Sequence, residues 1–311
     1  MSRFYSTIME TTLSSGLLVV PAAAALLIVG FFLLKPLLTR FIKRELSQED
    51  AAPVPVEWLR ELGQQVPLTN GLGAARRQLL LARARELIQT CHWEGCGGLT
   101  LTEPMQLVIA AQAALLALEL PADAYADLRE ILVYPSTMVP RRATPSRDPY
   151  AASEAGQPIA GEAWKTGTVV VSWGAALQGG VNPSDGHNTI LHEFAHILDF
   201  RAGLTAPIDL EIRRYDPILL STASTPSTRE VWHKLISDNY TRFCAQLEAN
   251  QPSVIDDYGA TNESEFFAVA TEVFFEKPAE LMAQYPELYA GLKFFYRQDP
   301  LLLHSSLHQA G

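Results

Sequence analysis

The sequence predicts an α+β fold, in which a mostly helical domain with a small β-sheet follows one transmembrane helix. Three observations predict this fold. Residues 17–34 form an apolar run that no charged residue interrupts. Several later segments repeat apolar residues at helical spacing, and residues 131–134 and 168–173 are short apolar runs typical of strands. The 311 residues, 48% of them hydrophobic, suffice for a sizeable core.

The N-terminal apolar run predicts a membrane anchor at residues 13–35, behind a short non-cytoplasmic tail at residues 1–12. At about 1.5 Å per residue, the run spans a hydrocarbon core of about 30 Å. A cleaved signal peptide is disfavoured because the positive charges follow the run, and a buried core helix because the run has no polar face. These charges place the C-terminal side in the cytoplasm: Lys35, Arg40, Lys43 and Arg44. We therefore expect a single-pass protein of the bacterial inner membrane, in contact with lipid, with a cytoplasmic catalytic domain.

Residues 36–55 are predicted to form a basic juxtamembrane segment and a linker. Residues 56–300 are predicted to form the folded domain. The net charge of −10 and the pI near 5.2 argue against nucleic acid as a partner. The three cysteines are few and odd in number, which is typical of reduced, unpaired thiols.

Two helices and two strands come before the most informative stretch. Residues 74–89 have an apolar face at helical spacing, and residues 105–120 predict a buried core helix that is too short for a second membrane span. Residues 131–134 predict the first strand. Residues 168–173 predict the second, which could be the edge strand that binds an extended substrate beside the site.

Residues 188–200 contain His192, Glu193 and His196 in the pattern H-E-x-x-H. On a helix the two histidines lie on one face, one turn apart, and can bind one metal ion. Glu193, next to the first, can reach a water on that metal. The rest of the segment is apolar nearly all round, as in a buried helix, where polar groups need partners. The sequence therefore favours a zinc site over three ordinary helix residues.

A third ligand must come from further along the chain, because no histidine follows at a usable spacing. Residues 261–275 repeat apolar residues at helical spacing and carry Glu263, Glu265 and Glu272. Glu265 and Glu272 are seven residues apart and share a helix face, whereas Glu263 lies off it. The residues alone leave the choice between Glu265 and Glu272 open.

The end of the chain is predicted to close the domain with two further helices, residues 278–281 and 285–296. Their aromatic face predicts core packing, and it includes Phe294, Phe295 and Tyr296. Residues 301–311 are predicted to form a loose C-terminal tail.

Two blocks carry a resemblance: His-Glu-Phe-Ala-His-Ile-Leu-Asp at residues 192–199 and Asp-Tyr-Gly-Ala-Thr-Asn-Glu-Ser-Glu-Phe-Phe-Ala at residues 257–268. They resemble the Mlc titration factor A (MtfA) family of zinc-dependent peptidases, and the second block is also similar to the protease domain of anthrax lethal factor. The resemblance covers about residues 56–300. It implies a zincin-type, gluzincin-like metallopeptidase domain with one Zn2+ per chain and aminopeptidase activity on short peptides.

The resemblance also implies roles for single residues. The positions that match the family's zinc ligands are His192, His196 and Glu265. Glu193 matches the general base, and Tyr258 matches the tyrosine that helps to stabilise the oxyanion. Behind the ligands, Asp199 could orient an imidazole, and Glu272 could support the site.

The predicted function is a membrane-anchored zinc metallopeptidase, a hydrolase that cleaves peptide substrates with a metal-activated water. The alternative is a regulatory binding protein of the same fold, because the family is named for sequestering a transcriptional repressor. A third hypothesis is that the zinc ion has only a structural role. Glu193 favours chemistry over both, because neither binding nor structural zinc needs a base beside a ligand.

Overall fold

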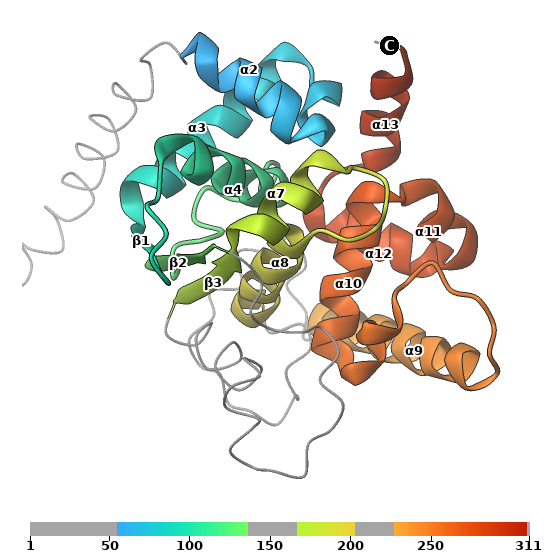
Figure 1. The fold of residues 1–311 in the computed structure, drawn as a ribbon. Coiled ribbons are helices and arrows are strands. Elements are labelled where there is room, and N and C mark those ends of the chain that lie inside the picture. Colours follow the sequence, from blue (N-terminus) through green and yellow to red (C-terminus); the bar gives the residue numbers. More distant parts are fainter. Residues whose placement is uncertain (1–54, 136–166, 203–226, 310–311) are drawn as a thin grey trace, which may run out of the picture. The chain divides into compact units, whose positions relative to one another are not determined.

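The computed structural model of the protein describes residues 55–135, 167–202 and 227–309 (Figure 1). They belong to one compact unit, Val54–Gly311, while the other unit, Met1–Pro53, lies outside the described residues. The described fold is mostly helical with a small parallel sheet, which confirms the predicted α+β class. The boundaries predicted for the N-terminal tail, the anchor, the linker and the domain stay predictions.

Helix α4 (Glu103–Leu116) lies at the centre of the first part of this unit, and every residue from Leu107 to Leu116 is buried. Before it come α2 (Val56–Gln65), the 3-10 helix η1 (Pro67–Gly71) and α3 (Ala74–Thr90). Both α2 and α3 pack against α4. The prediction of a buried core helix here is confirmed, because α4 is buried on all sides after its first turn.

Three parallel strands form the sheet in the order β1-β2-β3: β1 (His92–Gly95), β2 (Glu130–Tyr134) and β3 (Thr168–Ser172). The two predicted strands are confirmed, but the sequence does not predict β1, because His-Trp-Glu-Gly has no apolar pattern. Side chains alternate along the strands, so that one face of the sheet is buried. The residues that turn to the core from β2 and β3 are Ile131, Val133, Val169 and Val171.

Strand β3 leads directly into α7 (Trp173–Val181). Ser172 caps this helix, since its hydroxyl accepts a hydrogen bond from the backbone N–H of Ala175 at 3.3 Å. The strand therefore ends one residue before the predicted Trp173. Helix α8 (Thr189–Ala202) follows and packs against β3, α4 and α7.

Helix α10 (Glu263–Glu276) packs along α8, and the two helices lie side by side in the interior (Figure 1). It confirms the helix predicted over residues 261–275, and every residue from Phe266 to Glu276 is buried. The long helix α9 (Ser227–Glu248) and the short 3-10 helix η3 (Asp257–Thr261) precede it and contact it.

Three helices close the unit: α11 (Pro278–Gln284), α12 (Pro286–Tyr296) and α13 (Pro300–Gln309). Each begins with proline, which fits the first helical turn because its missing N–H has no partner there. The predicted loose tail is therefore corrected, since α13 extends to Gln309. Leu303, 2% exposed, anchors this helix to the core.

The aromatic residues at the end of α12 divide between core and surface. Phe295 and Tyr296 are buried, and the hydroxyl of Tyr296 lies 2.9 Å from that of Thr271. Phe294 is 66% exposed, so the prediction that it packs in the core is wrong. Consecutive helix residues point about 100° apart, and three in a row cannot all face one side.

Among the described residues, no helix combines the length and the apolar character that a membrane span requires. Helix α4 is apolar, but its 14 residues extend only about 21 Å against a hydrocarbon core of about 30 Å. This finding contradicts the predicted localisation as a single-pass protein of the bacterial inner membrane. It also lends no support to the predicted transmembrane helix or lipid contact. Residues 13–35, on which those predictions rest, lie outside the described residues.

Candidate metal centre

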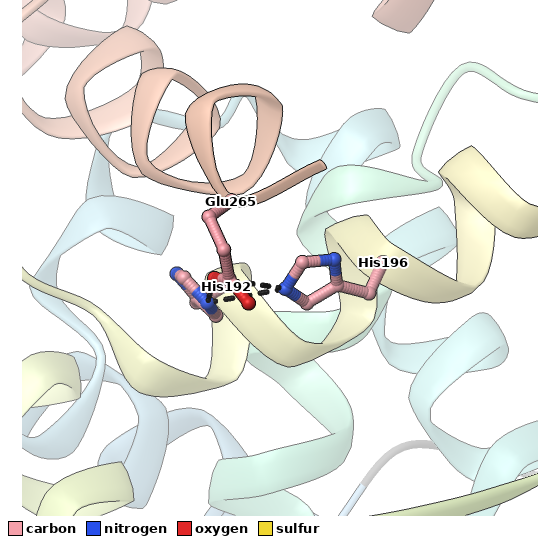
Figure 2. A group of neighbouring side chains, drawn as sticks. All are labelled: His192, His196 and Glu265. Carbon is pink, nitrogen blue, oxygen red and sulfur yellow. Dashed lines mark hydrogen bonds and ion pairs between the residues drawn. The ribbon is translucent and has the colours of Figure 1, made fainter. Parts of the chain in front are cut away.

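Helix α8 holds two histidines against each other. His192 and His196 are 6% and 1% exposed, and their Nε2 atoms lie 3.2 Å apart (Figure 2). Their rings meet edge to face, with centroids 4.8 Å apart. Buried apolar neighbours surround them on the same helix: Ile190, Leu191, Phe194, Ala195, Ile197 and Leu198. The predicted pair is therefore assembled inside the protein, where its polar atoms need partners.

Glu265 approaches both histidines from the first turn of α10. Its Oε2 lies 3.0 Å from Nε2 of His192 and 3.4 Å from Nε2 of His196. Asn262 caps α10, and its side-chain oxygen accepts hydrogen bonds from the backbone N–H groups of Ser264 and Glu265, both at 2.9 Å. The cap anchors the turn that carries Glu265. Three ligand-type atoms from two helices thus converge within 4.8 Å of one another.

The other nitrogen of each imidazole faces a polar partner. Nδ1 of His192 lies 2.7 Å from Oε1 of Glu272, which is fully buried. Nδ1 of His196 lies 3.1 Å from the hydroxyl of Ser264, which donates to Asp199 at 3.0 Å. Of the two residues predicted to support the site, Glu272 contacts His192 directly and Asp199 contacts Ser264. Their supporting roles stay predictions. Sequence reasoning did not identify Ser264. The one feature that could have indicated it is its position next to Glu265.

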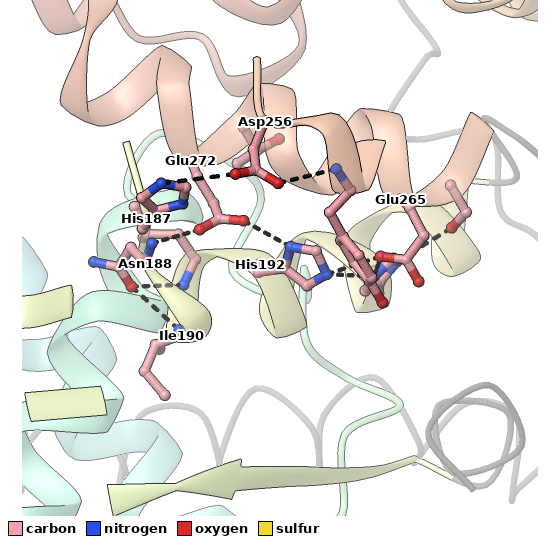
Figure 3. A network of polar contacts seen from close by, with 12 residues as sticks. His187, Asn188, Ile190, His192, Asp256, Glu265 and Glu272 are labelled. Atoms are coloured by element: carbon pink, nitrogen blue, oxygen red, sulfur yellow. Dashed lines mark hydrogen bonds and ion pairs between the residues drawn. The ribbon is translucent and has the colours of Figure 1, made fainter. Parts of the chain in front are cut away.

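Glu272 also contacts the start of α8, where Asn188 caps the helix (Figure 3). The side-chain oxygen of Asn188 accepts hydrogen bonds from the backbone N–H groups of Ile190 and Leu191, at 3.1 and 3.0 Å. The backbone N–H of Asn188 donates to Glu272. One carboxylate therefore orients His192 and sets the register of α8 against α10.

Glu276, one turn after Glu272 and 2% exposed, adds a second buried carboxylate at this place. It accepts hydrogen bonds from the backbone N–H groups of Gly186 and His187 and from the Asn188 amide, at 3.0, 3.1 and 3.1 Å. Gly186 has φ 79°, a conformation that glycine adopts without strain. Sequence reasoning did not identify Glu276. It could have been found as a second glutamate, after Glu272, on one face of a largely apolar helix.

The pKa values in the cluster reflect burial and pairing. Burial lowers the pKa of His192, but its contacts with Glu265 and Glu272 outweigh burial and raise it to about 10. Burial raises the pKa of Glu265, but hydrogen bonds with His192 and His196 outweigh it and hold this pKa well below its usual range. Burial, above all, raises the pKa of Glu276 to about 9. Positive charge is thus strongly favoured between the imidazoles and Glu265.

The donor set fits a zinc ion. Each Nδ1 faces an oxygen acceptor, so each ring carries its proton there and turns the Nε2 lone pair toward Glu265. Three acceptors then face one another, which requires a proton or a metal ion between them. Their separations of 3.2, 3.0 and 3.4 Å are close to the edge of about 3.3–3.4 Å of a tetrahedron with zinc bonds of about 2.0–2.1 Å. Two imidazoles and one carboxylate also leave a fourth position for water or substrate.

Two further predicted residues lie near this cluster. Glu193 is partly exposed, while the residues on either side of it on α8 are buried. Tyr258 lies in η3, and its ring centroid is 5.9 Å from that of His192. Asp256 holds the start of η3, since its carboxylate accepts a hydrogen bond from the backbone N–H of Tyr258 at 2.9 Å. Solvent therefore reaches the base candidate, and the tyrosine lies beside a candidate ligand.

Strand β3 lies at one end of the sheet and packs against α8. Within the described part of the chain, it pairs only with β2 and has a second edge that no strand covers. An exposed edge can bind an extended peptide through backbone hydrogen bonds.

Comparison with known proteins connects this arrangement to a peptidase family. The family described as glucose-regulated metallo-peptidase M90 matches residues 40–297. An uncharacterized protein of Synechocystis sp. is 39% identical over 251 residues, which cover 80% of this chain and 86% of the relative. Mlc titration factor A of Yersinia pestis is 30% identical over 258 residues, which cover 82% of this chain and 89% of the relative.

Proposed function

The chain belongs to the glucose-regulated metallo-peptidase M90 family, and we propose that it is a zinc-dependent, gluzincin-like peptidase with aminopeptidase activity on short peptides. Its relatives named Mlc titration factor A confirm the predicted family resemblance. His192, His196 and Glu265 would hold the zinc ion. The observation that supports this most strongly is the convergence of their Nε2, Nε2 and Oε2 atoms within 4.8 Å.

The proposed reaction assigns one task to each residue around the ion. Zinc in this position would polarise the scissile carbonyl and lower the pKa of water toward about 7. Glu193, next to His192 and partly exposed, takes the proton of the attacking water and passes it to the leaving amine. The hydroxyl of Tyr258 donates to the oxyanion. Glu272 keeps the proton of His192 on Nδ1, so that Nε2 retains its lone pair.

The peptide would bind along the edge of β3 opposite β2, which pairs with no other strand of the described residues. This strand packs against α8, which carries His192, Glu193 and His196. An extended peptide paired with β3 would bring its backbone carbonyl groups past the same helix. The preference for a free amino terminus is the part of the proposal that the family resemblance alone supports.

The test is hydrolysis of paired short peptides by the full-length protein. Each pair has one sequence and differs only in a free or an acetylated amino terminus. We expect wild type and Glu193→Gln to bind about one zinc per chain, with wild type cleaving the free peptides and the variant about 10²- to 10⁴-fold slower. If the acetylated peptides are cleaved as fast as the free ones, the protein is an endopeptidase and not an aminopeptidase. Equal activity of the variant would contradict the mechanism.

A second candidate function is regulatory binding of a protein partner, such as a transcriptional regulator. The observation that favours it is the name of the Yersinia relative, Mlc titration factor A. Capture of a partner does not require a base, so Glu193→Gln should retain binding but lose hydrolysis. If the wild-type protein binds zinc and cleaves none of these paired peptides, this candidate becomes the better one.

A further inference from the structure

Ser264 lies between a buried imidazole and a buried carboxylate. Its Oγ is 3.1 Å from Nδ1 of His196 and 3.0 Å from Oδ2 of Asp199. Both partners belong to α8 and are 1% and 4% exposed, whereas Ser264 comes from the first turn of α10. We propose that Ser264 is a positioning residue, whose hydroxyl couples Asp199 to His196 and holds this imidazole in the tautomer that binds zinc. The proposal rests on the zinc site proposed above.

The direction of both hydrogen bonds follows from the atoms available. The Ser264 hydroxyl donates to Oδ2 of Asp199, so its proton points to that residue. The hydroxyl has no second proton, and its oxygen must accept from Nδ1 of His196. The Nε2 lone pair of His196 then faces His192 and Glu265, at 3.2 and 3.4 Å. Alanine at position 264 would remove this acceptor and admit the other tautomer.

The two histidines are therefore oriented by different groups. His192 meets the carboxylate of Glu272 directly, at 2.7 Å. His196 meets a neutral hydroxyl, with a carboxylate behind it. A hydrogen bond to a charged group is about twice as strong as one between neutral groups. Loss of the Ser264 hydroxyl should therefore weaken zinc binding less than loss of the Glu272 charge.

The backbone of Ser264 is anchored independently of its side chain. Asn262 accepts hydrogen bonds from the backbone N–H groups of Ser264 and Glu265, each at 2.9 Å. Alanine is also a strong helix former. Ser264→Ala should therefore remove the bridge to His196 and leave Glu265 in place, which makes the variant a clean test.

The experiment measures two properties of the full-length protein. Zinc affinity is determined by competition with a chelator, and the protonated nitrogen of His196 is identified by 15N NMR of the metal-free protein. Wild type is compared with Ser264→Ala, Ser264→Thr, Asp199→Asn and the double variant Ser264→Ala/Asp199→Asn. Ser237→Ala, in α9, makes the same chemical change outside the network and is the matched control.

We expect Ser264→Ala to weaken zinc binding about tenfold and to give a mixture of His196 tautomers, because the bridge is lost. Ser264→Thr keeps a hydroxyl and should retain most of the affinity and one tautomer. The double variant should bind zinc no more weakly than the weaker single variant, since both changes break one bridge. Ser237→Ala should match wild type.

Two results would overturn the role of Ser264. One is zinc affinity of Ser264→Ala within twofold of wild type together with an unchanged His196 tautomer. The other is an equal loss for alanine and threonine, which would indicate packing instead of the hydroxyl. A wild-type protein that binds no zinc would instead overturn the proposed function. The tautomer of His196 in the metal-free protein would still decide the role of Ser264.

Discussion

Glu265 and Glu272, two turns apart on α10, contact opposite nitrogens of one imidazole. Oε2 of Glu265 lies 3.0 Å from Nε2 of His192, and Oε1 of Glu272 lies 2.7 Å from its Nδ1. The side chain of Glu265 is 14% exposed, whereas that of Glu272 is fully buried. A zinc ligand needs access to the open side of the metal, and a supporting carboxylate does not. The geometry therefore separates the candidate ligand from its support.

Replacing each of these two glutamates by glutamine should weaken zinc binding to different extents. Glu272→Gln should cost about 10- to 100-fold in affinity, because it removes a charge behind a ligand. Glu265→Gln should cost more, because it removes a charged donor that faces the metal itself. Chelator competition on the full-length variants measures both. An equal loss, or a larger loss for Glu272→Gln, would contradict the assignment.

The metal-free protein should lose stability as pH rises. The folded pKa of His192 is raised to about 10, above the value of about 6.5 in an unfolded chain. Its protonated form therefore stabilises the fold; this contribution is complete below about pH 6.5 and is lost as pH rises through about 10. A zinc ion held by His192, His196 and Glu265 would replace that proton, so the protein with zinc should show a flatter profile. Urea unfolding across this pH range, with chelator or with zinc, measures the difference. Stability that rises with pH without metal would contradict the prediction.

Glu276→Ala should destabilise the protein and loosen the start of α8. It leaves three donors unsatisfied, from Gly186, His187 and Asn188, at a cost of about 1–3 kcal/mol for each that stays buried. Thermal unfolding measures the loss. Glu280→Ala is the matched control, since Glu280 is exposed on α11 and should matter little. An unchanged unfolding midpoint for Glu276→Ala would show that water replaces its contacts.

Asn262→Ala should weaken both helix α10 and the zinc site. The side chain caps the backbone N–H groups of Ser264 and Glu265, and loss of such a cap costs about 0.5–2 kcal/mol. Zinc affinity should fall because the turn that carries Glu265 is no longer anchored. Thr102→Ala is the control, since Thr102 stands at the N-cap of α4 without a side-chain capping bond. Equal effects of the two variants on stability and affinity would contradict a special role for Asn262.

Tyr258→Phe should lower turnover and leave zinc affinity unchanged. The ring of Tyr258 lies 5.9 Å from that of His192, and phenylalanine keeps this packing without the hydroxyl. Loss of one oxyanion donor typically costs about 10²- to 10³-fold in kcat. Steady-state kinetics on a cleaved peptide measure the change. Full activity of the variant would assign Tyr258 a packing role only.

Local patterns in the sequence predict a large part of this fold. Helices α4, α8 and α10 each have an apolar run long enough to recognise, and β2 and β3 have compact runs of branched residues. Strand β1 has no such signal, because His-Trp-Glu-Gly becomes a strand by pairing with β2. Phe294 is apolar but exposed, and the sequence could not predict this because its exposure depends on how α12 lies against its neighbours.

A spacing of four residues is a local property of helices, so the sequence alone predicts that His192 and His196 share one face of a buried helix. The contacts of each imidazole nitrogen, by contrast, arise only when the two helices pack in the folded chain. Glu265 and Glu272 are 73 and 80 residues from His192, and Ser264 is 68 from His196. Contacts across such separations depend on the register of α10 against α8, which capping and packing set, and no local pattern encodes that register.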